Sequence, residues 1–209
     1  MAETPVKIAI CIPSGDMVHM DFTVSLSVML ARLGAQRIDC SLYNVKTTIL
    51  SKGRQTLVNR ALASGASHLL FLDSDMSFPP ETALQLLGHR VDIAGVTYTT
   101  RRDGALMSSA LKRWGERLAV GPDDGLVEAD FIGFGGVLIR ADVFRAIEKP
   151  WFPIAFRGED PEKGDQWLGE DYGFCEKARA AGYRIHVDAG LSYRFGHAGQ
   201  RTFRLHDLT

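Results

Sequence analysis

The residues most suggestive of chemistry are two aspartates that directly follow a short apolar run. Residues 68–72 (His-Leu-Leu-Phe-Leu) predict a buried strand, and Asp73-Ser74-Asp75 begins where that strand ends. Two carboxylates this close repel one another unless one is protonated or both share a cation. Hard divalent ions prefer oxygen ligands and complete their shells with water and phosphate oxygens. The triplet therefore predicts a site for Mg²⁺ or Mn²⁺ and a phosphorylated substrate, although the same residues could simply form a turn.

Two later stretches carry side chains that could complete such a site. Glu170 and Asp171 open a predicted helix over residues 170–181, and His197 lies among small residues near the C-terminal end. Carboxylates at a helix N-terminus often only complement the helix dipole. In an enclosed site, however, such a group can accept the proton of an attacking hydroxyl. A histidine whose small neighbours allow close approach is a candidate metal ligand.

The elements that must position these residues alternate between strand and helix patterns over the first hundred residues. Short apolar runs predict strands at residues 6–12, 37–45, 68–72 and 92–98. Apolar residues at helical spacing predict helices at residues 22–33, 55–63 and 79–87. This alternation predicts βαβ units and a parallel sheet with helices on both faces. Ligands bind beyond the carboxyl ends of parallel strands, which is where Asp73 and Asp75 would lie.

The pattern changes after residue 100. Residues 101–130 are rich in turns, and residues 150–166 lack periodicity and are interpreted as a loop. The other predicted elements are strands at 126–132 and 137–139 around a glycine-rich segment, helices at 141–148 and 170–181, and a strand at 184–187 before a polar tail. Gly34 and Gly182 are predicted C-terminal helix caps. The sheet is therefore expected to be mostly parallel, with a small antiparallel part in the C-terminal half.

Composition limits the classes of protein that fit. The chain has 209 residues, 45% apolar and 23% charged, as in one globular domain. Lys and Arg number 24 against 25 Asp and Glu, so a net charge of −1 gives no reason to expect nucleic acid or a membrane surface as a partner. Three cysteines outside any CxxC pattern argue against a disulfide scaffold and favour a reducing compartment. No apolar run approaches the ~20 residues of a membrane span, and no secretory signal is visible, so we expect a cytoplasmic protein.

Taken in order, these motifs resemble those of GT-A-type glycosyltransferases, most closely the family 2-like branch. The resemblance covers roughly residues 6–199. The matching segments are the first strand and its loop (10–14), a basic helix (53–55 and 59–62), the DxD box (71–76), a glycine-rich strand entry (133–140), an acidic helix start (169–175) and a C-terminal metal histidine (196–197). Residues 98–128 match no segment of the family, so the acceptor stays open.

The resemblance implies a single domain over residues 1–209 with the α/β/α sandwich of nucleotide-diphospho-sugar transferases. Its nucleotide-binding half would span about residues 1–100, and its acceptor and catalytic half about residues 101–209. The implied reaction is metal-dependent transfer of a sugar from a UDP- or GDP-sugar to the hydroxyl of an acceptor. Mn²⁺ or Mg²⁺ would be the cofactor, and nothing in the sequence specifies the oligomeric state.

The resemblance also implies residue roles. Asp75 and His197 would hold the divalent cation on the donor diphosphate, with Asp73 on the metal or the ribose. Asp171 would be the base of an inverting transfer, and Glu170 an alternative base or a partner of the acceptor. The other residues expected at the donor are Pro13, Ser14, Arg54, Asn59 and Ser74. The residues expected at the acceptor or sugar are Tyr98, Gly135, Gly136 and Trp167.

Two alternatives stay open on the sequence. A haloacid-dehalogenase-like phosphatase also places Asp-x-Asp after an apolar strand, with the first aspartate, here Asp73, as nucleophile. That motif normally lies near the N-terminus, whereas 72 residues precede Asp73 here. The second alternative is a nucleotide-sugar-binding module that has kept the fold without the chemistry.

Overall fold

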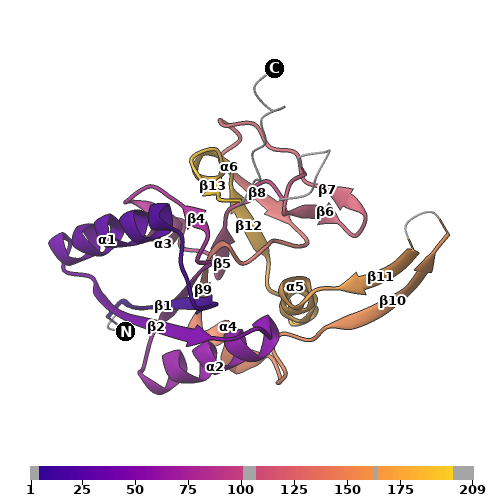
Figure 1. The fold of residues 1–209 in the computed structure, drawn as a ribbon, viewed down its shortest axis with the longest axis horizontal. Helices are drawn as coiled ribbons and strands as arrows, with labels where there is room; N and C mark the ends of the chain where they lie inside the picture. The colour runs from indigo at the N-terminus through magenta and orange to yellow at the C-terminus, as the bar shows by residue number, and fades with distance from the viewer. Residues whose placement is uncertain (1–4, 101–106, 162–163, 200–209) are drawn as a thin grey trace, which may run out of the picture.

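A seven-stranded sheet of order β2-β1-β3-β9-β5-β12-β8 forms the centre of the molecule (Figure 1). The computed structural model describes residues 5–100, 107–161 and 164–199. The strands of this sheet are β1 (Lys7–Ser14), β2 (Asp39–Lys46), β3 (His68–Leu72), β5 (Ile93–Gly95), β8 (Leu126–Ala129), β9 (Gly136–Arg140) and β12 (Ile185–Asp188). The helices are α1 (Met20–Ala35), α2 (Leu50–Ala63), α3 (Thr82–Gly88), α4 (Ala141–Ala146), α5 (Glu170–Ala180) and α6 (Ala189–Ser192).

The directions of the strands confirm the predicted fold class. β1 pairs in parallel with both β2 and β3, and β5 pairs in parallel with β12. β9 runs antiparallel between β3 and β5, and β8 lies antiparallel beside β12 at one edge. The two reversed strands both come from the C-terminal half of the chain, as expected. The carboxyl ends of β1, β3 and β5 therefore meet at one edge of the sheet, where ligands bind in open α/β folds.

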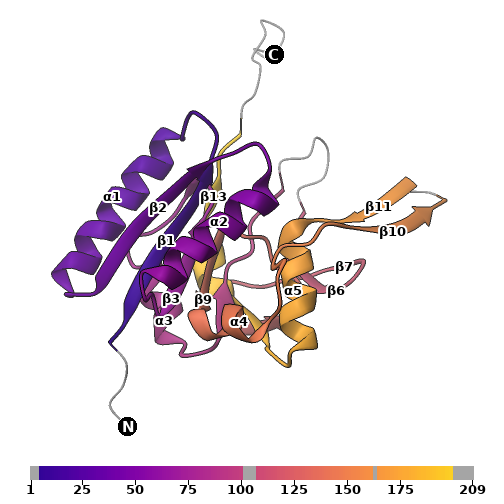
Figure 2. The ribbon, with the colours of Figure 1, turned by 90° about the horizontal axis from the view of Figure 1, so that it is seen from below.

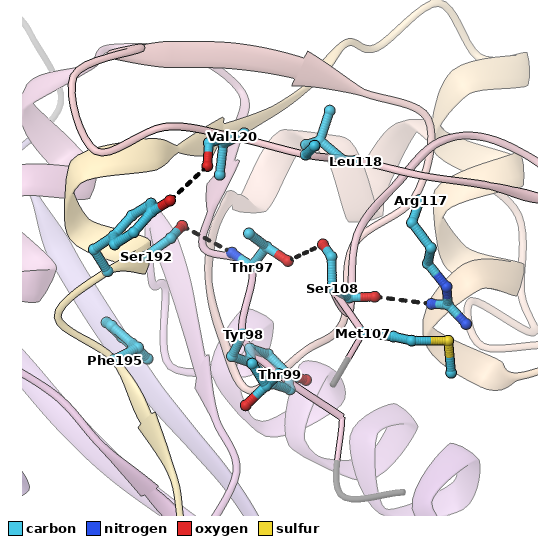
Figure 3. Close-up of a pocket in the computed structure, with 12 residues that line it drawn as sticks. Thr97, Tyr98, Thr99, Met107, Ser108, Arg117, Leu118, Val120, Ser192 and Phe195 are labelled. Atoms are coloured by element: carbon cyan, nitrogen blue, oxygen red, sulfur yellow. Dashed lines mark hydrogen bonds between the residues drawn. The ribbon is translucent and has the colours of Figure 1, made fainter. Parts of the chain in front are cut away.

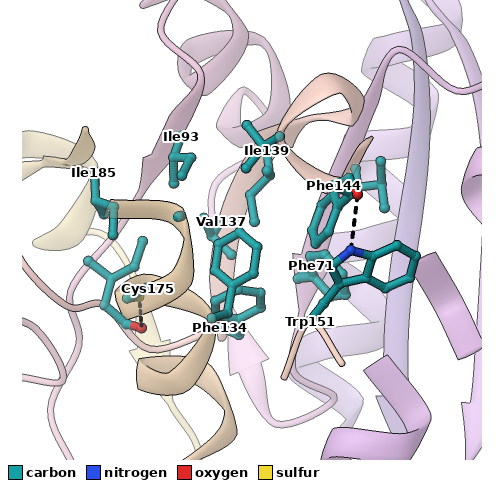
Figure 4. Close-up of a cluster of buried hydrophobic side chains, with 14 of the residues drawn as sticks. Phe71, Ile93, Phe134, Val137, Ile139, Phe144, Trp151, Cys175 and Ile185 are labelled. Carbon is teal, nitrogen blue, oxygen red and sulfur yellow. Dashed lines mark hydrogen bonds between the residues drawn. The ribbon is translucent and has the colours of Figure 1, made fainter. Parts of the chain in front are cut away.

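The inner strands β1, β3, β5 and β9 are buried on both faces, and their side chains alternate between two apolar clusters. Ile8 and Ile10 of β1 pack with Met29 of α1 on one face. The intervening Ala9 packs with Leu57 of α2 on the other. Figure 4 shows part of this second cluster, which also receives side chains from α4 and α5. Burial of both faces explains why these strands appear in the sequence as continuous apolar runs.

The loop predicted at residues 150–166 is wrong. β10 (Ala155–Asp160) and β11 (Gly164–Leu168) form an antiparallel hairpin there. The hairpin projects from the body of the molecule in both ribbon views (Figures 1 and 2). Because most of its side chains are exposed or half-buried, no alternation of apolar and polar residues marks its strands. The rings of Phe156 and Trp167 pack across the two strands, with centroids 5.2 Å apart.

Other differences from the sequence prediction lie at the ends of elements. Gly34 is not a cap, because α1 continues through it and the chain turns at Arg37 with φ 55°. Gly182 follows α5 with φ 89°, which confirms it as a cap. Two short strand pairs complete the fold: β4 (Met76–Ser77) with β13 (Gly196–His197), and β6 (Leu111–Arg113) with β7 (Glu116–Arg117). The turns expected at residues 101–106 and the tail at residues 200–209 lie outside the described residues.

Gly173 allows α5 to pack closely against the chain before β10. A Cβ at this position would lie 2.1 Å from the backbone oxygen of Pro153. Relieving that clash would require the main chain at Pro153 to shift. We expect Gly173→Ala to lower the free energy of unfolding, measured by urea titration, by about 2–3 kcal/mol. The matched control is Gly34→Ala, where no atom lies within 4 Å of the added Cβ, and alanine should leave stability unchanged or raise it. Equal effects of the two substitutions would contradict this packing argument.

Candidate active site

The pairing of β4 with β13 brings two distant motifs together at the carboxyl edge of the sheet. Met76 lies opposite His197, and Ser77 lies opposite Gly196. A Cβ at position 196 would lie 2.4 Å from Oγ of Ser77, so a larger residue there would require the serine hydroxyl to move. One residue further along, the amide of Ala198 donates to the backbone oxygen of Asp75 at 2.8 Å. The loop after β3 and the C-terminal histidine are therefore neighbours.

The side chains of Asp75 and His197 face one another. Oδ2 of Asp75 lies 3.7 Å from Nε2 of His197, and the imidazole is only 12% exposed. On the other side of the ring, Nδ1 lies 2.8 Å from the carbonyl oxygen of Thr99. A carbonyl only accepts, so Nδ1 carries a proton, and in the neutral form of the ring the Nε2 lone pair would face Asp75. A lone pair facing a carboxylate is favourable only when a proton or a cation lies between them.

This pair of side chains fits a divalent cation as two protein ligands. A carboxylate and an imidazole both suit Mn²⁺, and Mg²⁺ is commonly held by one or two carboxylates plus water and phosphate oxygens. Among the residues that the structure describes, no group of three or more His, Cys, Asp or Glu side chains is placed to hold a metal ion. A cation at Asp75 and His197 would therefore take its remaining ligands from water and from a bound phosphate-bearing molecule.

Arg54 of α2 links two acidic segments that are far apart in the sequence. Its side chain is 3% exposed. Nη1 donates to Oε1 of Glu170 at 2.5 Å, and Nη2 donates to Oδ1 of Asp73 at 3.0 Å. The guanidinium also lies over the ring of Phe134, 5.1 Å from its centroid. Burial alone would lower the pKa of Arg54, but the neighbouring carboxylates raise it above its ordinary value, so the guanidinium stays charged.

Asp171 follows Glu170 at the start of α5 and lies within the same group of charges. Burial raises the pKa of the Asp171 carboxyl to about 6, with Arg54 opposing that rise and Glu170 and Asp73 adding to it. Its Oδ1 accepts the amide of Tyr172 at 2.8 Å. A carboxyl with a pKa in this range is ionised near neutrality and can still take up a proton, which is the property of a general base.

Tyr98 connects this acidic group to the pair formed by Asp75 and His197. Its ring meets the imidazole of His197 edge-on, with centroids 5.2 Å apart. Its hydroxyl accepts the amide of Gly135 at 3.1 Å. Burial, together with the nearby aspartates at positions 73 and 171, raises the pKa of the Tyr98 phenol well above its usual value, so the hydroxyl keeps its proton. The loop after β3, the acidic start of α5 and the segment around His197 therefore all lie near Tyr98.

The glycines of segment 133–136 lie against aromatic rings. A Cβ at Gly135 would come within 2.8 Å of the ring of Tyr98, and a Cβ at Gly136 would come within 2.6 Å of the ring of Phe195. Both glycines are buried. The structure thus places Gly135 and Gly136 at the site, with the space beside their Cα atoms already filled by these two rings.

The residues expected at the donor are divided between two locations. Pro13 and Ser14 end β1 at the same edge of the sheet as Asp73. Asn59, by contrast, lies on the exposed face of α2, whereas Arg54 lies on the buried face. The structure therefore brings Pro13 and Ser14 to this edge, and it does not bring Asn59 into the acidic group.

Ser74 and Trp167 lie at the periphery. The backbone oxygen of Ser74 accepts the amide of His19 at 3.0 Å, which ties the loop after β3 to the start of α1. Trp167 is 59% exposed on β11, three residues before Glu170. Its position leaves an indole face accessible close to the acidic start of α5.

Two residues that shape the site were not predicted from the sequence. Thr99 orients the imidazole of His197 through its backbone oxygen, and Phe134 lies under the guanidinium of Arg54. Thr99 could have been found, because it follows the predicted strand at residues 92–98 and so lies at the same edge as Asp73. No comparable sequence pattern marks Phe134, because its role depends on packing between α2 and the segment before β9.

Comparisons with known proteins agree on the fold. No protein-family model matches the chain, and no curated protein matches it in sequence. The structure of A197 from STIV is 14% identical, with 96% of this chain and 97% of that chain covered and a TM-score of 0.57. A Drosophila β-1,4-galactosyltransferase 7 mutant, solved with manganese, UDP-Gal and xylobiose, is 14% identical, with 97% and 79% covered and a TM-score of 0.53. The chain therefore has a GT-A-like fold.

Within residues 5–100, 107–161 and 164–199, no helix combines the length and the apolar character needed to cross a membrane.

Proposed function

We propose that this protein is a glycosyltransferase that moves a sugar from a nucleoside-diphosphate sugar to an acceptor hydroxyl. The observation that carries the proposal is the convergence of Asp171 with the facing pair Asp75 and His197 around Tyr98, at the carboxyl edge of a GT-A-like sheet. Sugar transfer needs a base for the hydroxyl and stabilisation for the departing diphosphate, and these groups could supply both.

The donor would lie over β1 and β3. Asp75 and His197 would hold Mn²⁺ or Mg²⁺, which when bound would offset the negative charge that develops on the departing diphosphate. Pro13 and Ser14 at the end of β1, and Ser74 in the loop after β3, would contact the UDP or GDP moiety. Asp73 would receive the ribose or approach the cation. Arg54 would act on the donor side by holding Asp73 in place.

Asp171 would accept the proton of the acceptor hydroxyl while the hydroxyl oxygen attacks the anomeric carbon. The new C–O bond forms as the bond to the diphosphate breaks, and the electron pair of that bond leaves with the nucleoside diphosphate. A single displacement of this kind inverts the anomeric configuration. Glu170 is the weaker candidate for the base, because its carboxylate is already engaged in an ion pair with Arg54.

The acceptor would lie on the other side of Tyr98 from the donor loops. Tyr98 and Trp167 would present aromatic faces to a sugar ring, and Gly135 and Gly136 would allow the rings of Tyr98 and Phe195 to pack closely beside the site. The phosphatase alternative is less well supported, because Asp73, its would-be nucleophile, is committed to an ion pair with Arg54.

Nucleotide binding should depend on metal. In a thermal-shift assay, UDP or GDP with Mn²⁺ at about 100 times Kd should stabilise the fold by about 2.7 kcal/mol, raising Tm by roughly 5–10 °C. Either component alone should have a much smaller effect. His197→Ala should abolish the metal-dependent part of the shift. If no nucleoside diphosphate raises Tm in the presence of Mn²⁺ or Mg²⁺, the proposed function is wrong.

Turnover should also depend on pH through the base. Only the ionised form of Asp171 can accept a proton, and the pKa of this carboxyl is raised to about 6. We therefore expect kcat/KM for sugar transfer to rise with pH up to about 6 and to level off above pH 7. The control is nucleotide binding measured over the same range. A rate that falls between pH 5 and pH 7 while binding stays constant would argue against Asp171 as the base.

A further inference from the structure

A cavity of about 590 Å³ opens beside the proposed site, on its acceptor side (Figure 3). Its walls come from the segments that follow β5, β7 and α6, and from Met107 and Ser108. A volume of this size lies within the range of about 300–1,000 Å³ that is typical of small-molecule sites. The cavity is therefore large enough for a substrate group.

The walls of this pocket are mainly apolar. Apolar surface comes from side chains on three segments, among them Met107, Leu118, Val120 and Phe195. Several polar groups in the walls already have partners within them. As Figure 3 shows, the hydroxyl of Ser192 accepts the amide of Thr97. The hydroxyl of Tyr193 donates to the carbonyl of Val120 at 2.8 Å.

Because these polar groups are satisfied, a polar ligand would lose its hydration in the pocket with little compensation. The hydroxyls of Thr97 and Ser108, for example, bond to each other at 2.6 Å. An apolar group would gain from leaving water without leaving any polar atom unsatisfied. The chemistry of the walls thus selects a ligand that carries an aryl or alkyl group.

The pocket and the proposed site share a wall. The hydroxyl of Tyr98 is held at the glycine-rich segment by Gly135, while the same residue lines the pocket. Thr99, whose backbone oxygen orients His197, also lines it. On the opposite side, Arg117 donates to the hydroxyl of Tyr172, the residue that follows Asp171. A ligand in the pocket would therefore lie next to Tyr98 and Thr99, which contact the histidine, and next to Arg117, which contacts the residue that follows Asp171.

Arg117 is the charged residue of the lining. Its Nη1 donates to the backbone oxygen of Ser108 at 2.9 Å, and no carboxylate pairs with it among the residues that the structure describes. Because this exposed guanidinium is in no ion pair within the described residues, it can bind an oxygen on the ligand without first losing a carboxylate partner. It would favour a ligand with apolar and polar ends over a plain hydrocarbon.

We propose that this pocket binds the apolar group of the acceptor, an aryl or alkyl substituent attached to the sugar or alcohol that receives the glycosyl group. The proposal rests on the proposed function, because it takes the neighbouring Asp171 as the base for the acceptor hydroxyl. It names a substrate class: an amphipathic glycoside or alcohol, rather than a free monosaccharide.

The test compares probes that share a sugar and differ only in the apolar group. Methyl and p-nitrophenyl β-glycosides of glucose and galactose are titrated against the full chain in the presence of UDP and Mn²⁺, with dissociation constants obtained by NMR. Burial of an aryl ring should make the p-nitrophenyl probes bind at least about tenfold more tightly than the methyl probes. Equal affinities, or no binding of the aryl probes, would overturn the proposal.

A blocking variant locates the effect. Ala119 lines the pocket and is exposed, so Ala119→Trp should fill it without disturbing the core. The matched control is Ala31→Trp, at an exposed position of α1. The aryl preference should disappear in the first variant and persist in the second. Nuclear Overhauser contacts from the aryl protons to the methyl groups of Met107 and Leu118 test the same point without a substitution, and their absence would contradict the proposal.

The thermal-shift assay with nucleoside diphosphate and Mn²⁺ separates this inference from the proposed function. If nucleoside diphosphate raises Tm but the p-nitrophenyl probes bind no more tightly than the methyl probes, the glycosyltransferase proposal stands and the apolar acceptor is refuted. Aryl binding at the pocket without any nucleotide shift refutes glycosyl transfer, and with it the assignment of the bound group as an acceptor.

Discussion

Asp171→Asn is expected to lower the rate of sugar transfer about a thousandfold, the typical effect of removing a general base. Asparagine keeps the shape of the side chain, and its amide oxygen can still accept the backbone N–H of Tyr172. It cannot take the proton of the acceptor hydroxyl. Nucleotide binding with Mn²⁺ should be unchanged, because the cation pair Asp75 and His197 is untouched. The measurement is single-turnover transfer at saturating donor.

The same substitution should stabilise the fold. The folded-state pKa of the Asp171 carboxyl is raised from 3.8 to about 6, so ionisation costs the folded protein free energy at neutral pH. That cost is absent below about pH 4, grows as pH rises to about 6 and is fully present above it. Asparagine removes it, and we expect the free energy of unfolding at pH 8 to rise by about 1–2 kcal/mol, the shift being discounted for partial exposure.

Urea titrations at pH 4 and pH 8 check this, because the advantage of the variant should appear only at the higher pH. Normal turnover in Asp171→Asn would refute Asp171 as the base. If Asp171→Asn instead lowered the free energy of unfolding at pH 8, the ionised carboxylate of Asp171 would stabilise the folded protein, contrary to this argument.

Arg54→Met should have the largest effect on stability. Methionine fills part of the same volume but leaves Glu170 and Asp73 without their shared cation, next to Asp171. Removing one partner of a buried ion pair typically costs about 3–5 kcal/mol, because the remaining charge stays buried and uncompensated. We expect a loss of about 3 kcal/mol in the free energy of unfolding at pH 7.5, together with loss of transfer activity.

Two further variants test the reason for that loss. Arg54→Lys should recover only part of the stability, because an ammonium group cannot bond both carboxylates in the fixed geometry of a guanidinium. Glu170→Gln added to Arg54→Met should recover part as well, since it removes one of the stranded charges. If Arg54→Met proves as stable as the original protein, the two ion pairs contribute nothing and Arg54 does not hold the site together.

The sequence by itself determined the elements and their sheet. The short apolar runs, the helical spacing and the order of the motifs were enough to predict a mostly parallel sheet and to place Asp73 and Asp75 at its carboxyl edge. Apolar runs and helical spacing are local properties of the chain, and the sheet topology follows from general rules for connecting strands and helices. Both can therefore be predicted without knowing which distant residues are in contact. The hairpin at residues 155–168 was missed because exposed strands lack the apolar alternation on which strand prediction depends.

Only the tertiary structure decided what the candidate site residues touch. Arg54 was expected to face the nucleotide, yet its guanidinium lies between Asp73 and Glu170, and Glu170 is 116 residues away in the sequence. The orientation of His197 depends on the backbone oxygen of Thr99, 98 residues away. Contacts of this kind depend on how whole helices and strands pack. Residue types and spacing can therefore indicate which residues lie at the edge of the sheet, but not which of their atoms form bonds there.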